Sequence, residues 1–556
     1  MTQGIYSYLI SFSLVSITYI WIYTRRRYRS KSLALAPLAP TPHFVTKYFG
    51  LVPPPSTSEK TDEISKFLIR AGQDSKYSPV SVCWSITGKP LVVVSTLKGI
   101  KDVLITGQHK SKNEIPKVQR GDLIRLIHNL VFGGKNLNNT IGEASKKRGE
   151  WRWRRHVLLP PFQPKQLVPK LLPYVTRRVN DLMELFAKHA EEGSAAELDS
   201  YFMDTTMDVI NYYLYGRHDL NYDLVGGRTN LKFIHGHLGF GFQSLKAWLP
   251  FGINKTDWGQ KSYKPAREQL KTFIRDSLKY ALQDYHYDLK KFKERGIPPK
   301  DHIYRSVAAC AFASGRYGED HVDLVNDLLA LTFAGYDTTA HTLAFTFAEL
   351  AQNPQLQEDL FNQVRQVLGP PPIDPDTITT EKLARMPLVT AVYKEALRKY
   401  PAVVFIPVHV NRDILVDGVV VPGDSEIWCN VRGVQMNPRI FPDPDKFDPT
   451  RWLRPEHEES EDHSFDTFKP PSTSVDLITP SNQYDFPDIA FTLGQHSCLG
   501  KNLATLELRL IIASTVNQFT FHLKEGCHID TKVVLTTKPR HGVWTYFKKR
   551  VNDAVQ

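Results

Sequence analysis

The segment at 491–500 constrains this chain more than any other, because it places one cysteine directly before a helical run. It reads FTLGQHSCLG and is followed by KNLATLELRL. The sulfur of a cysteine in this place lies near unpaired backbone N–H groups and the positive end of the helix dipole, and both stabilise a thiolate. Gly494 and Gly500 allow tight turns and the close approach of backbone to a flat ligand. The alternative is a buried, inert thiol, the usual fate of a free cysteine.

The number of cysteines bears on the cellular compartment. The chain has five in 556 residues: Cys83, Cys310, Cys429, Cys498 and Cys527. A sparse, odd-numbered set excludes a disulfide scaffold and fits a reducing compartment. We predict one functional thiolate, at Cys498, and four bystanders.

A second unusual segment, AGYDTT, lies inside a long helix predicted over 321–352, which an Asn-Pro pair ends. Gly335 in mid-helix costs about 1 kcal/mol relative to alanine, which suggests a closely packed neighbour. The acid Asp337 and the alcohols Thr338 and Thr339 are unusual amid apolar turns, and threonine hydroxyls often bond back to an earlier carbonyl of the helix. The alternative is a kinked core helix in which Asp337 faces solvent.

The cysteine segment resembles the haem-binding signature of the cytochrome P450 family, Phe-x-x-Gly-x-Arg-x-Cys-x-Gly. The resemblance implies that haem b binds against Gly494 and Gly500, and that Cys498 is the proximal thiolate ligand of its iron, which favours O–O cleavage. His496 stands where the family usually has an arginine that contacts a haem propionate. A histidine there still donates a hydrogen bond, and it makes propionate binding more sensitive to pH.

The AGYDTT segment resembles the distal-helix signature of the same family. The resemblance implies that Gly335 makes room for dioxygen. It also implies that Thr338 contacts the oxygen and that Asp337 helps to relay protons to it from water, with Thr339 as the weaker candidate.

Further motifs match the family residues that hold the haem propionates. Trp151 and Arg155 fit the Trp-x-x-x-Arg signature within WRWRR. The arginine fork suits a carboxylate, and the indole adds an N–H donor. The alternative is a basic, solvated helix face. His409 is the candidate for the second propionate, with Arg412 as runner-up.

A structural triad is implied by two more matches. Glu395 and Arg398 share one helix face at i and i+3, which alone is a weak signal. They match the family's Glu-x-x-Arg motif, and PTRW at 449–452 resembles its Pro-x-Arg-Phe/Trp segment. Arg451 is therefore expected to complete a Glu395–Arg398–Arg451 network that fixes geometry more than it adds stability.

The pattern of the chain predicts a mainly α protein with a minor β region. Helical periodicity dominates 149–353 and returns at 382–400, whereas SVCWSIT and PLVVVS predict a hairpin over 81–94. The resemblance assigns the cytochrome P450 fold to one haem domain over 61–556. Within it, the acidic and Ser/Pro-rich insert at 454–483 has few apolar residues and is interpreted as a solvated loop.

The N-terminus predicts a membrane anchor. Residues 4–23 carry no charge and are long enough to cross a bilayer as a helix. A basic cluster follows rather than precedes them, and no small-x-small cleavage site is present, which argues against the alternative of a cleaved signal peptide. We assign 1–24 to the anchor and 25–60 to a basic, proline-rich linker. The basic cluster then predicts a single-pass protein whose body faces the cytosol, and the resemblance to the cytochrome P450 family implies the endoplasmic reticulum membrane.

The resemblance implies a haem-thiolate monooxygenase that inserts one oxygen atom from O2 into a hydrophobic substrate. No flavin or nicotinamide motif is evident, so electrons are expected from NADPH through NADPH–cytochrome P450 reductase, with cytochrome b5 as a further candidate partner. Residues 233–251 and 403–407 are expected to contribute pocket walls. The alternatives are a P450-fold isomerase or dehydratase acting on peroxides, and a non-catalytic haem-binding protein.

The net charge of +12 can be explained by several kinds of binding partner or by ordinary surface charge. No nucleic-acid-binding module accompanies the charge, so a nucleic-acid partner is not expected. The basic cluster at 146–155, with Lys501, offers a docking face for acidic redox partners. The alternative is ordinary surface charge.

Overall fold

The chain folds into two compact units, and each unit is built from three separate segments. The computed structural model describes residues 19, 22–23, 63–73, 78–84, 89–107, 117–121, 124–125, 128, 132–140, 150–216, 264–298, 302–317, 321–371, 373–374, 377–453, 489–533 and 535–550. The first unit comprises Met1–Leu126, Val403–Asp445 and Phe491–Ser497, and the second comprises Ile127–Ala402, Lys446–Ala490 and Cys498–Gln556. The haem domain expected over 61–556 therefore draws on both units.

Several expectations fall on residues outside the described ranges. They are most of the anchor at 1–24, the linker at 25–60, the insert at 454–483 and the proposed pocket wall at 233–251. Of the anchor, the structure describes only Tyr19, Ile22 and Tyr23, which are helical. Among the described residues, we find no helix with the length and apolar character needed to traverse a bilayer.

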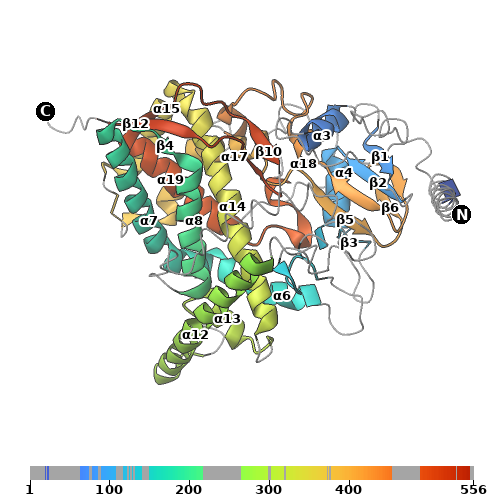
Figure 1. Cartoon of the computed structure of the whole chain (residues 1–556), viewed down its shortest axis with the longest axis horizontal. Coiled ribbons are helices and arrows are strands. Elements are labelled where there is room, and N and C mark those ends of the chain that lie inside the picture. The colour runs from blue at the N-terminus through green and yellow to red at the C-terminus, as the bar shows by residue number, and fades with distance from the viewer. Residues whose placement is uncertain are drawn as a thin grey trace, which may run out of the picture. The chain divides into compact units, whose positions relative to one another are not determined.

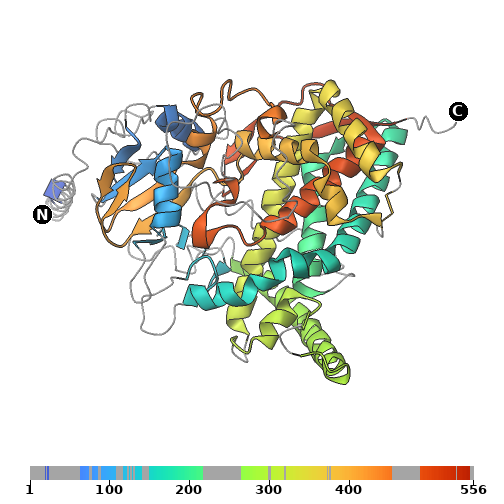
Figure 2. The same cartoon turned by 180° about the vertical axis from the view of Figure 1, so that it is seen from behind.

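The first unit is built on a five-stranded sheet in the order β1-β2-β8-β5-β3 (Figure 1). Its strands are β1 (Val80–Trp84), β2 (Pro90–Val94), β3 (Val118–Arg120), β5 (Ile406–Val410) and β8 (Glu426–Cys429). The predicted hairpin is confirmed, because β1 and β2 pair antiparallel with Val82 opposite Val92. Strand β2 is buried along its whole length and pairs with β8 in parallel, which suits its run of β-branched residues. Figure 2 shows the same blue and orange strands from behind.

Short elements flank this sheet. They are α3 (Glu63–Gln73), α4 (Leu97–Lys101), the π-helix η3 (Asp102–Thr106), α18 (Val431–Gln435), the 3-10 turn η12 (Gly494–His496), and a hairpin of β6 (Ile414–Val416) and β7 (Val419–Val421). Helices α3 and α18 pack with their backbones in close approach, since a Cβ on Gly72 would lie 2.5 Å from the Gly433 carbonyl oxygen. Asn430 strengthens this contact by capping the Gly433 N–H and donating to the Leu68 carbonyl.

The second unit is mainly helical, as predicted. Its helices are α6 (Glu150–Leu158), η4 (Pro160–Phe162), α7 (Pro164–Glu192), α8 (Leu198–Tyr215), α12 (Lys264–Glu294), α13 (Val307–Ala313), α14 (Val322–Ala351), α15 (Pro354–Leu368), α16 (Thr380–Ala384), α17 (Pro387–Lys399), η9 (Pro449–Trp452) and α19 (Lys501–Gln518). The 3-10 turn η11 (Ile489–Phe491) ends in the first unit. Figure 2 shows α19, in red, among the green and yellow helices.

Short strands complete the second unit. The sheet β4-β12-β9 joins β4 (Ala196–Glu197), β12 (Trp544–Lys549) and β9 (Phe519–Leu523), and a hairpin pairs β10 (Thr531–Val533) with β11 (Thr537–Pro539). Aromatic side chains cover the sheet, and Phe186 of α7 stacks on Phe547 with ring centroids 4.3 Å apart. The prediction of many helices with a minor sheet region is confirmed.

One expected helix is divided in two. The sequence predicts a single helix over 382–400, but the structure has α16 and then α17, with a break at Arg385 and Met386. Pro387 explains the break, because proline lacks the N–H that a continuing helix requires and suits the first position of a new one.

The long helix α14 matches its predicted bounds closely and lies alongside α8 (Figure 1). Asn353 caps the following helix by accepting from the Leu356 N–H, and Pro354 begins that helix. The closely packed neighbour expected for Gly335 is Ile210 of α8, whose side chain is 1% exposed. A Cβ on Gly335 would lie 2.5 Å from Ile210 Cγ1. The glycine therefore permits the close approach of α14 to α8.

We predict that Gly335→Ala destabilises the protein although alanine favours helices. Overpacking a buried contact costs about 1–3 kcal/mol, against a propensity gain of about 1 kcal/mol. Urea unfolding should show a lower midpoint with an unchanged slope, and Ile210→Ala in the same background should recover part of the loss. If Gly335→Ala were more stable than the parent by the propensity gain alone, the proposed contact would be wrong.

Candidate functional site

Cys498 lies two residues before Gly500, the N-cap of α19. Gly500 has no side chain with which to cap the first N–H groups of α19. Cys498 itself is exposed. An exposed thiol at a helix N-terminus is the setting that stabilises a thiolate.

The other cysteines differ from Cys498 in burial. Burial raises the pKa of Cys83 to about 12, and it raises the pKa values of Cys310 and Cys429 as well. Cys527 is half-buried. Three of the four expected bystanders are therefore thiols rather than thiolates at neutral pH.

Trp151 and Arg155 lie one turn apart on α6, as their spacing predicts. Trp151 is buried, and the Arg155 guanidinium carbon lies 6.0 Å from the centroid of its ring. Burial lowers the pKa of Arg155, whereas the charge of the nearby Cys498 raises it. The structure thus brings the predicted arginine and the predicted thiolate into one electrostatic environment.

The neighbouring Arg154 has a different role from the one expected for the basic cluster. Its side chain is fully buried and bonds Asp327 through Nη1 and Asp323 through Nη2, both at 2.5 Å. The Tyr317 hydroxyl also donates to Asp327, at 2.8 Å. Despite these partners, burial raises the pKa of Asp327 to about 6. Arg154 therefore ties α6 to α14, and it is not available for the docking face predicted at 146–155, whereas Arg152 is exposed.

Helix α14 is buried along most of its length but has one accessible stripe. Ala334 is exposed, and Leu331, Gly335 and Thr338 are partly exposed, at the three- and four-residue spacing of one helix face. Thr338 donates its hydroxyl proton to the Ala334 carbonyl at 3.0 Å, on this stripe. Thr339 is buried, which agrees with its lower rank as a relay residue.

Asp337 lies on the buried side of α14, so the alternative of a solvent-facing acid is wrong. Its Oδ1 is 3.0 Å from His341 Nε2, and its Oδ2 accepts a hydrogen bond from the Thr536 hydroxyl at 2.6 Å. His341 Nδ1 in turn lies 2.6 Å from Asp199 Oδ1 at the start of α8. Asp337 is thus turned away from the stripe that carries Thr338, its neighbour in the chain.

The predicted triad is assembled around Glu395. Arg398 bonds both carboxylate oxygens, through Nε at 2.9 Å and Nη2 at 2.8 Å, and both residues are fully buried. Arg451 Nε lies 3.4 Å from Glu395 Oε1. The Trp452 indole N–H also donates to Glu395, at 2.9 Å, as does the backbone N–H of Asp448. The network joins α17 to η9.

Four candidate cofactor residues, counting the runner-up Arg412, belong to the first unit. His409 is half-buried on β5, opposite Glu426 of β8, and Arg412 is exposed in the turn that follows. Gly494 adopts a left-handed φ of 71°, which explains the need for glycine there. His496 closes η12 and is half-buried. Their part in a cofactor site stays a prediction.

The residues of the second unit fit a haem group. A haem iron needs a thiolate that is open to it, and Cys498 is exposed. The flat ring needs backbone without obstruction, and a Cβ on Gly500 would meet nothing within 4 Å. Propionates need cations, and Arg155 lies near Cys498. The chemistry of these groups agrees with the cofactor implied by the sequence.

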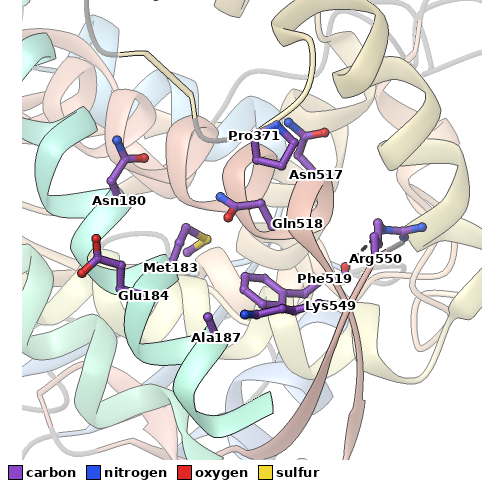
Figure 3. A pocket seen from close by; sticks show the side chains of 10 residues that line it. All are labelled: Asn180, Met183, Glu184, Ala187, Pro371, Asn517, Gln518, Phe519, Lys549 and Arg550. Atoms are coloured by element: carbon purple, nitrogen blue, oxygen red, sulfur yellow. Dashed lines mark hydrogen bonds between the residues drawn. The ribbon is translucent and has the colours of Figure 1, made fainter. Parts of the chain in front are cut away.

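A cavity of about 270 Å³ lies elsewhere in the second unit (Figure 3). It is lined by α7, by the C-terminal end of α19 and by β12, with Glu184, Asn517 and Lys549 among its residues. Because α19 has 18 residues, this end lies roughly 27 Å from the Cys498 end at about 1.5 Å per residue. The cavity is therefore separate from the Cys498 site.

The sequence did not indicate four residues around these groups. They are Asp199, His341, Thr536 and, as a hydrogen-bond donor to Glu395, Trp452. His341 follows Asp337 by four residues, so its helical spacing was a usable signal. Asp199 and Thr536 come from distant segments, and no local pattern indicates them.

Comparison with known proteins points to one family. The model of the family "Cytochrome P450" matches residues 73–544. A search of solved structures finds the cyanobacterial CYP120A1 with retinoic acid bound, at a TM-score of 0.61 and 19% identity, covering 86% of this chain and 93% of that one. At this identity the likeness concerns the fold.

Curated relatives show the same family name at low identity. The probable cytochrome P450 4ac1 of Drosophila melanogaster is 29% identical over 36% of this chain and 34% of its own length. The mitochondrial cytochrome P450 11B3 of Rattus norvegicus is 24% identical over 66% and 67%. The mitochondrial sterol 26-hydroxylase of Homo sapiens is 28% identical over 47% and 43%. The chain thus spans between about a third and two thirds of these relatives.

Proposed function

Because the chain belongs to the cytochrome P450 family of haem-dependent oxidoreductases, we propose that it is a haem-thiolate monooxygenase. It inserts one oxygen atom from O2 into a hydrophobic organic substrate, and the other atom leaves as water. The observation that carries this proposal is the exposed Cys498 before α19, in the electrostatic neighbourhood of Arg155.

The residues around the haem take distinct parts. When bound, haem supplies the activation of dioxygen. Cys498 holds the iron as a thiolate, and Arg155 and Trp151 bind a propionate through charge and an indole N–H. The Thr338 hydroxyl holds a proton on the accessible stripe of α14. Gly335, which has no side chain, makes room for dioxygen beside it.

Asp337 completes the proton relay. We propose that Asp337, in its ionised form, supports the relay of protons from water to Thr338 from the buried side of α14. In the first unit, His496 and His409 would bind propionates and Gly494 would let the backbone approach the ring; in the second unit, Gly500 would do the same. The Glu395–Arg398–Arg451 triad holds the segment that leads to η9.

The partners follow from the absence of a flavin or nicotinamide motif in the sequence. Electrons come from NADPH through NADPH–cytochrome P450 reductase, with cytochrome b5 as a second donor. The uncharged segment at 4–23 supports a single-pass anchor in the endoplasmic reticulum membrane, with the body in the cytosol. A relative whose name refers to a sterol agrees with an apolar substrate.

The carbon monoxide difference spectrum of the reduced protein tests the haem-thiolate assignment. A thiolate-type band is expected. Reductase-dependent NADPH consumption with a panel of fatty acids, sterols, terpenoids and polyketides then tests the oxygenase reaction. Turnover of an organic peroxide without NADPH would instead indicate an isomerase or dehydratase, and a thiolate band without any turnover would indicate a haem-binding protein.

A further inference from the structure

The second unit contains a buried chain of charged groups that the proposed function does not use in full. Asp199, His341 and Asp337 are joined by contacts of 2.6 and 3.0 Å, and the side chains are 15%, 2% and 0% exposed. The chain links the start of α8 to α14. Thr536, just before β11, adds a hydroxyl donor to Asp337.

The geometry fixes the charge of the imidazole. Ionised carboxylates only accept hydrogen bonds, so a ring with a carboxylate oxygen at each nitrogen must donate from both, which makes it an imidazolium. Although burial lowers the pKa of His341, the charges of Asp337 and Asp199 outweigh it and raise the pKa to about 10. Asp337 accepts from His341 at one oxygen and from Thr536 at the other, as an ionised carboxylate does.

We propose that His341 is a positioning residue that acts through Asp337. It is a permanent cation between two acids, and it keeps the Asp337 carboxylate ionised throughout the neutral pH range. Asp199 fixes the orientation of the ring. This inference rests on the proposed function insofar as Asp337 relays protons, whereas the charge arrangement itself does not depend on haem.

Other charged groups face the same cluster. Lys538 of β11 is electrostatically coupled to Asp337 and Asp199, and burial lowers the pKa of this lysine. Lys532 of β10 acts on Lys538. Glu197 lies beside Asp199, and burial raises the pKa of Glu197. His341 itself lies within hydrogen-bond distance of Asp337, at 3.0 Å.

The first test compares His341→Gln with the parent by unfolding across pH 5–10, which requires no activity. His341 has a raised pKa, so its stabilisation is fully present below about pH 6.5 and is lost as pH rises towards about 10. His341→Gln should lack this loss of stability between pH 6.5 and 10. The exposed His522 provides a matched control, because His522→Gln should leave the pH profile unchanged.

The second test measures product formed per NADPH consumed between pH 6 and 9. In His341→Gln, burial without a bonded cation should raise the pKa of Asp337, so product formation should fall about tenfold per pH unit below the new value. In the parent protein, the product formed per NADPH consumed should vary little over this pH range. Addition of Asp337→Asn should remove the new pH dependence, since no carboxyl remains to titrate there.

The outcomes separate the two proposals. If His341→Gln keeps the parent's loss of stability above pH 6.5, the ring is not the buried cation and the inference is overturned. If the variant is less stable but its product formation stays independent of pH, the role is structural only and the positioning role is overturned. A parent protein without a thiolate-type spectrum would overturn the proposed function but leave the unfolding comparison intact.

Discussion

Replacing Cys498 with serine is expected to abolish both the thiolate-type carbon monoxide spectrum and reductase-dependent product formation. A serine hydroxyl does not ionise near neutral pH, so the helix dipole of α19 and the charge of Arg155 cannot convert it into an equivalent ligand. The loss should exceed that of any other single change, because the donor atom itself is removed. Absorption spectra and turnover with reductase provide the measurement.

The chain supplies a control for this substitution. Cys527 is half-buried and lies beyond β9, away from the start of α19. Cys527→Ser should therefore retain the spectrum and the turnover of the parent. A Cys498→Ser protein that kept the thiolate band would show that another cysteine ligates the iron.

Glu395→Ala is expected to lower stability by about 3–5 kcal/mol, because it leaves the buried Arg398 without its carboxylate partner. Trp452 and Arg451 lose their shared acceptor as well. We expect haem incorporation to fail at 37 °C and to recover partly at lower temperature. The measurements are the haem-to-protein ratio after purification and the urea midpoint of the recovered protein.

Glu294 offers a matched comparison for Glu395. It is exposed near the end of α12 and lies 3.9 Å from Lys290, also within one helix. Such pairs contribute about 0–1 kcal/mol, so Glu294→Ala should change the midpoint only slightly. Equal effects of the two substitutions would contradict the structural role assigned to the triad.

The sequence predicted much of the architecture because local signals are strong where elements begin and end. The Asn353-Pro354 pair marks the end of α14, and the β-rich runs around 81–94 mark the first hairpin. The Glu395 network was predicted by resemblance, and its members lie together as expected. Trp452 lies in the PTRW motif, but nothing in the sequence shows that its N–H donates to Glu395.

Most of the contacts that could not be predicted from the sequence join residues that lie far apart in the chain. Asp199 and His341 are separated by 142 positions, and only the packing of α8 on α14 brings them together. Gly335 indicated a close neighbour without identifying Ile210. Arg154 sits within a basic run that looks solvated, yet α14 supplies two acids that make its burial tolerable.

The stretch after α19 has a practical consequence for protein engineering. Thr536 donates to Asp337 inside the unit, Gln357 of α15 bonds the Phe521 carbonyl, and Arg550 pairs with Glu358 at 2.7 Å. Truncation before these residues would open the core rather than trim a tail. Affinity tags at this end therefore need a spacer beyond residue 550.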